Sequence, residues 1–88
     1  MFFELVKLEL ANSRREHGNI RSEHEALGIM DEEWQEVRDE IHKKELDKKE
    51  LLKELVQLAA MCAKTAEDLG LMQEPPAERD IVTDGVCS

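Results

Sequence analysis

The chain has 88 residues, enough for one small domain and too few for two domains with separate cores. Its 21 acidic and 12 basic side chains give a net charge of −9. Such a chain repels nucleic-acid phosphates and anionic lipid surfaces, so we expect it to bind neither nucleic acid nor membranes. Abundant Glu, Lys, Leu and Ala favour helices, so the predicted fold class is all-α.

The N-terminal segment does not resemble a secretion signal. Glu4 and Lys7 interrupt its apolar run, and no basic segment precedes that run. No apolar stretch is long enough to span a bilayer. Two cysteines, Cys62 and Cys87, are too few for a disulfide framework. We therefore expect a reduced protein with a cytoplasmic location.

The first predicted helix covers residues 2–16. Phe3, Val6 and Leu10 recur at helical spacing, and neighbouring apolar residues widen this stripe. A helix with so broad an apolar face has to bury much of it. Gly18 and Asn19 then supply the residues of a turn.

The second predicted helix starts at Ser22 and runs to about Lys43. Ser22 and Glu25 have the spacing of a capping box, in which each side chain accepts a hydrogen bond from a free backbone amide. Alternating steps of three and four residues predict the buried side, with Trp34 packed at its centre. That side comprises Leu27, Met30, Trp34, Val37 and Ile41.

The third predicted helix starts near Asp47 and ends at Gly70, where a left-handed stop residue is expected. We expect Cys62, on its apolar side, to be a buried structural thiol. The predicted domain is therefore residues 1–70, followed by a tail over residues 71–88. The apolar side of this helix comprises Leu51, Leu55, Leu58, Cys62 and Leu69.

Three short helices cannot cover all of these apolar stripes. We expect helices two and three to form an antiparallel hairpin. We expect the remaining apolar surface to be buried by self-association into a homodimer or homotetramer, which completes a helical bundle.

Acidic side chains gather on the second helix, where residues 22–43 carry eight acidic and two basic groups. At about 100° per residue, its glutamates share one arc beside the apolar side. In an antiparallel hairpin, Glu33 and Glu36 can face Glu54 of the third helix. Converging carboxylates suit a hard cation such as Mg²⁺. The alternative is an ordinary solvated acidic face. The arc contains Glu25, Glu32, Glu33, Glu36 and Glu40.

These residues resemble the signature of a known family. Residues 32–36 (Glu-Glu-Trp-Gln-Glu), followed after seventeen residues by Glu54, are similar to the EExxE…ExxD pattern of MazG-like all-α nucleoside triphosphate pyrophosphohydrolases. The segments at residues 17–26 and 54–61 resemble those of a short bacterial and phage branch of that family. The similarity covers about residues 17–70.

The resemblance implies a Mg²⁺-dependent hydrolase, with Mn²⁺ as an alternative ion, that cleaves a nucleoside triphosphate to the monophosphate and pyrophosphate. It implies that Glu33, Glu36 and Glu54 are metal ligands. Glu32 is implied as a further ligand or as the group that orients the attacking water. The catalytic set is therefore Glu32, Glu33 and Glu36. Gln57 takes the position of the family's aspartate and is the fourth expected metal ligand.

Gln57 departs from the family pattern, because an amide oxygen can ligate but brings no charge. Glu50 and Asp68 are the nearby acidic residues that can offset this loss. The departure keeps a second function open: a catalytically degenerate helical module that oligomerises or binds another protein.

Two further residues are candidates for binding the substrate. Lys53 lies beside Glu54 and can reach a triphosphate, and His24 lies at the start of the second helix, where it can contact a phosphate or a base. Both types of residue are also common on solvated helix surfaces.

Overall fold

A computed structural model describes residues 1–73, and the later part of the predicted tail, residues 74–88, lies outside the described residues. The described chain is all-helical, as predicted. None of its helices combines the length and the apolar run that crossing a bilayer requires. The elements are α1 (Phe2–His17), α2 (Glu23–Ile41), α3 (Lys48–Asp68) and a 3₁₀ turn, η1 (Leu71–Gln73).

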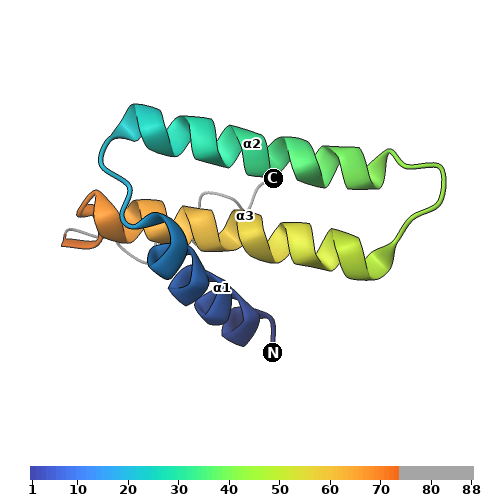
Figure 1. The fold of residues 1–88 in the computed structure, drawn as a ribbon, viewed down its shortest axis with the longest axis horizontal. Helices are drawn as coiled ribbons and strands as arrows, with labels where there is room; N and C mark the ends of the chain where they lie inside the picture. The colour runs from blue at the N-terminus through green and yellow to red at the C-terminus, as the bar shows by residue number, and fades with distance from the viewer. Residues whose placement is uncertain (74–88) are drawn as a thin grey trace, which may run out of the picture.

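Helix α3 is the central element of the structure. Both α1 and α2 pack against α3, whereas α1 and α2 make no direct helix–helix contact with each other. Figure 1 shows α2 lying alongside α3, with α1 placed obliquely against the other side of α3. Helix α3 therefore contacts both of the other helices, each along a different side.

The predicted helix starts are confirmed by their caps. The Ser22 hydroxyl accepts a hydrogen bond from the Glu25 amide at 3.1 Å. The Glu25 carboxylate accepts one from the Arg21 amide, one residue earlier than in a standard capping box. At α3, Asp47 accepts hydrogen bonds from the amides of the second and third helical residues. Helix α2 ends at Ile41, two residues before the predicted end.

The connection between α1 and α2 is fastened to the C-terminal end of α3. Gly18, with a φ of 73°, ends α1 in a conformation that favours glycine. Asp68 accepts a hydrogen bond from the Ile20 amide at 2.7 Å and pairs with Arg14 at 2.6 Å. Burial opposes ionisation of Asp68, but these two partners hold its pKa below the usual value.

The apolar core within the described chain is small, and its main cluster lies between α1 and α3 with Ile29 and Met30 of α2 packed against it. Its buried members are Val6, Val56, Ala60 and Met61, with partly buried neighbours around them. So small a core supplies limited stability to a chain of this size.

The predicted buried sides of α2 and α3 are wrong in part. Trp34 is 47% exposed, and Leu27 and Ile41 are also exposed. Cys62 is exposed rather than buried. On α2, Val37 is buried as predicted, whereas Ala26 and Glu40 are buried in place of their neighbours Leu27 and Ile41.

We predict that Arg14→Ala destabilises the fold by about 2 kcal/mol, because Asp68 would keep a buried negative charge without its cationic partner. Urea unfolding followed by circular dichroism measures the change. Arg15→Ala is the matched control, since Arg15 is exposed and hydrogen-bonds only to Asn12 of its own helix in the described structure. Equal stability of the two variants would contradict the assigned role of Asp68.

Candidate functional site

Three carboxylates meet where α2 packs against α3. Glu33 and Glu36 come from successive turns of α2, and Glu54 comes from the second turn of α3. One oxygen of each lies within 4.8 Å of one oxygen of both others. We call Glu33, Glu36 and Glu54 the carboxylate seam. The structure therefore brings together the three glutamates that the sequence singled out.

Two glutamates of the carboxylate seam each have a buried carboxylate oxygen that accepts no hydrogen bond within residues 1–73. Glu54 is only 8% exposed. One oxygen of Glu54 and one of Glu33 are buried and have no hydrogen-bond partner within residues 1–73. A buried polar atom without a partner is costly, and in native proteins it commonly marks a place for a ligand, ion or water.

The charges of the carboxylate seam repel one another. Burial and the neighbouring Glu36 raise the pKa of Glu33 from 4.5 to about 7. Burial, with Glu36 and then Glu50, raises the pKa of Glu54 to about 7. Near neutral pH the seam therefore holds a proton readily, and a divalent cation can take the place of that proton.

The donor set and spacing fit a hard cation. Mg²⁺ and Ca²⁺ prefer oxygen ligands, and opposed ligands lie about 4.1–5.0 Å apart across such ions. Three carboxylate oxygens within 4.8 Å match that size. Gln57 is three residues after Glu54 on α3 and lines the adjoining cavity. Its role as a fourth ligand stays a prediction.

A cavity of about 590 Å³ adjoins the carboxylate seam, between α1 and α2 and above α3. This volume is within the range of small-molecule sites. Glu32, predicted to ligate or to orient water, lies in its wall. The acidic residues lining the cavity are Glu9, Glu16, Glu25, Glu32, Glu33 and Glu36.

Lys64 is a functional candidate that the sequence analysis missed. It is 2% exposed, lines the 590 Å³ cavity and donates a hydrogen bond to the Ser13 hydroxyl at 2.8 Å. The signal in the sequence is that Lys64 follows Glu54, Gln57 and Met61 in steps of three and four residues, and so shares their side of α3. An ammonium group has three donors, and the Ser13 contact uses one of them.

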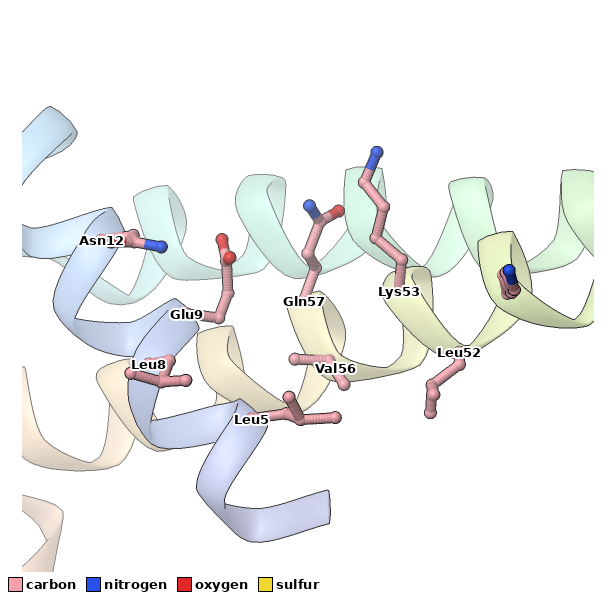
Figure 2. Close-up of a pocket in the computed structure, with 9 residues that line it drawn as sticks. Leu5, Leu8, Glu9, Asn12, Leu52, Lys53, Val56 and Gln57 are labelled. Carbon is pink, nitrogen blue, oxygen red and sulfur yellow. The ribbon is translucent and has the colours of Figure 1, made fainter. Parts of the chain in front are cut away.

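The two predicted substrate-binding residues lie elsewhere. His24 is exposed and lines neither of the two cavities described in residues 1–73. Lys53 pairs with Glu50 at 3.4 Å and lines a second, mainly apolar cavity of about 340 Å³ between α1 and α3. Figure 2 shows Lys53, Gln57 and Glu9 extending toward one edge of this cavity, away from Leu52. Substrate binding by His24 or Lys53 stays a prediction.

Asp68 cannot replace the family's aspartate, because Arg14 and the Ile20 amide already bind its two oxygens. Glu50 remains the nearby candidate to offset Gln57, since one of its oxygens lies within 4.8 Å of one oxygen of Glu54. Comparisons with family models, with curated proteins and with solved structures each returned no match for this chain.

We predict that the metal-free protein loses stability as the pH rises from 5 to 8. The folded-state pKa values of Glu33 and Glu54 lie above 4.5, so the folded chain binds more protons than the unfolded chain between pH 4.5 and 7. Their stabilising contribution is complete below pH 4.5 and is lost as the pH rises through 7. We expect the melting temperature in EDTA to fall by about 5–10 °C.

The matched variants for this measurement are Glu54→Gln and Glu45→Gln. The first removes a titrating buried carboxyl and is expected to flatten the pH profile, whereas the second lies in the exposed connection after α2 and is expected to keep it. A wild-type melting temperature that rises over the same pH range would contradict the assigned burial of the carboxylate seam.

Proposed function

We propose that this protein is a Mg²⁺-dependent nucleoside triphosphate pyrophosphohydrolase that releases a nucleoside monophosphate and pyrophosphate. The observation that carries the proposal is the carboxylate seam, in which buried, unpaired oxygens of Glu33 and Glu54 converge with Glu36 beside a cavity. The resemblance of residues 32–36 and Glu54 to the MazG-like signature supplies the reaction class. Mn²⁺ is the alternative ion.

The chain's own charges explain why such a reaction requires a cation. The cavity wall is strongly acidic, and by itself it repels a triphosphate. A bound divalent ion neutralises phosphate oxygens and orients a water nucleophile. In this proposal Glu33, Glu36 and Glu54 hold the ion, Gln57 contributes a neutral oxygen, and Glu32 orients or accepts a proton from the water.

The position of Lys64 favours a phosphorylated substrate over an uncharged one. It places a buried ammonium group in the wall of the same cavity as Glu33 and Glu36. Polyphosphate chains are commonly bound by a basic side chain together with a metal ion held by carboxylates, and this cavity offers both kinds of residue. In the described structure the Lys64 side chain is a better-placed phosphate ligand than that of Lys53, which is 59% exposed.

We predict that Glu36→Gln and Glu54→Gln each lower the rate of pyrophosphate release by at least about 100-fold, because each removes a charged metal ligand. A panel of canonical and modified nucleoside triphosphates, assayed with and without Mg²⁺, measures turnover. Glu45→Gln is the control and is expected to keep full activity. Circular dichroism verifies that every variant is folded.

Absence of turnover on every nucleotide tested would contradict the hydrolase. The second candidate would then hold: a helical module without catalytic activity that acts by oligomerising or by binding another protein. The exposed apolar faces of α2 and α3 are the observation that favours it.

The proposal includes an antiparallel hairpin of α2 and α3. Contacts support it, because early α2 meets late α3 and late α2 meets early α3. The Thr65 hydroxyl lies 3.8 Å from the Met30 sulfur, and Glu40 lies near Glu50 at the other end. A six-residue connection, residues 42–47, joins the two helices.

Self-association of this hairpin buries its exposed apolar side. Leu27, Trp34 and Ile41 recur every seven residues on α2, as Leu55 and Cys62 do on α3. At about 100° per residue, each line lies about 90° from the α2–α3 contact, and in an antiparallel hairpin both lie on the side away from α1. Two copies placed face to face on this side form a four-helix bundle, which makes a homodimer or, with further contacts, a homotetramer.

We predict that Trp34→Glu weakens self-association at least about tenfold, since it places a charge at the centre of the apolar side. Analytical ultracentrifugation over a concentration series measures the effect. Gln35→Glu adds the same charge one residue away, outside this apolar line, and is expected to leave the assembly intact. A wild-type protein that is monomeric at about 100 μM would refute the assembly.

A further inference from the structure

A second group of carboxylates lies next to the carboxylate seam, toward the connection between α2 and α3. Glu40 is in the last turn of α2, and Glu50 and Glu54 occupy successive turns on one side of α3. One oxygen of each lies within 4.8 Å of one oxygen of both others. We call Glu40, Glu50 and Glu54 the loop-side cluster. It shares Glu54 with the carboxylate seam.

The burial of the loop-side cluster is what points to a ligand. Glu40 is 7% exposed and Glu54 is 8% exposed. Each has one buried oxygen without a hydrogen-bond partner within residues 1–73. Ionised carboxylates on a solvated face do not show this property, because water binds both of their oxygens. The spacing of the three oxygens also matches the diameter of a single Mg²⁺, Mn²⁺ or Ca²⁺ site.

The neighbouring lysines leave these inner oxygens free. Lys43 contacts one oxygen of Glu40 at 2.7 Å, and it is the other oxygen of Glu40 that is buried without a partner. Lys53 contacts Glu50 at 3.4 Å. Both lysines are exposed, so they hold the carboxylates from the outer side and fix their orientation.

We propose that Glu40, Glu50 and Glu54 form a second divalent-cation site, so that Glu54 bridges two ions. The inference rests on the proposed function for the identity of the first site, the carboxylate seam. It also gives a physical reason for the neutral Gln57. The charge that Gln57 lacks is supplied on the other side of Glu54, by Glu50 of α3, about two turns before Gln57, and by Glu40 of α2.

Manganese titration of the chelator-treated, full-length protein tests this inference. The binding stoichiometry is measured by isothermal titration calorimetry and by the loss of the free Mn²⁺ signal in electron paramagnetic resonance. We expect two Mn²⁺ per chain, and a spin-coupled spectrum at full loading because one carboxylate bridges the ions. Glu50→Gln is expected to weaken binding of the second ion at least about tenfold while the first ion stays bound.

Two variants separate this inference from the proposed function. Glu33→Gln is expected to weaken binding of the first ion. Glu45→Gln, in the exposed connection, is expected to bind both ions with normal affinity. Binding of one Mn²⁺, unaffected by Glu50→Gln, would overturn the second site even if the protein hydrolyses nucleotides. Binding of two Mn²⁺ in a protein without turnover would support the second site and contradict the hydrolase. If Glu50→Gln fails to fold, Glu40→Gln gives the same readout from the α2 side.

Discussion

The structure depends on the burial of carboxylates between α2 and α3. Glu33, Glu36, Glu40 and Glu54 lie along the contact where a helical hairpin ordinarily places leucines. An isolated buried carboxylate is unfavourable, and several near one another are more so. The raised pKa values of Glu33 and Glu54 express this cost. A bound proton relieves this cost, and a bound cation would do so in the proposed function, so either ligand would strengthen the contact between the two helices.

Local features of the fold were predictable because they depend on neighbouring residues. Ser22 and Asp47 fix the starts of α2 and α3 by accepting hydrogen bonds from nearby backbone amides. These hydrogen bonds join residues that are close in the sequence, so they do not depend on how the helices pack. The meeting of Glu33 and Glu36 with Glu54 was predictable because residues 42–47 are too few to join helices that are not adjacent. The reaction class came only from the resemblance.

The orientation of the helices was not predictable by the rule that apolar sides face inward. That rule placed Trp34 and Cys62 in the core, but both are exposed. It fails because hydrophobic periodicity identifies the apolar side of a helix without showing whether that side faces the other helices of the same chain. Lys64 was missed for the related reason that a lysine is assumed to be solvated. Its burial depends on Ser13, fifty-one residues earlier in the chain, which no local pattern reveals.

The described chain leaves many large apolar side chains exposed, so a ligand or a second copy that binds the folded state would add stability to it. The seven buried apolar residues of the described chain are mostly small, while larger ones such as Leu27, Trp34 and Ile41 are exposed to water. In the proposed function, a cation on the carboxylate seam and a second copy on the apolar side of α2 and α3 would each bind the folded state and not the unfolded chain, so each would stabilise the fold by mass action. The two act on different sides of the same helix pair. Because both proposed interactions require α2 and α3 to be packed together, cation binding and self-association would favour each other without any contact between the ion and the second copy.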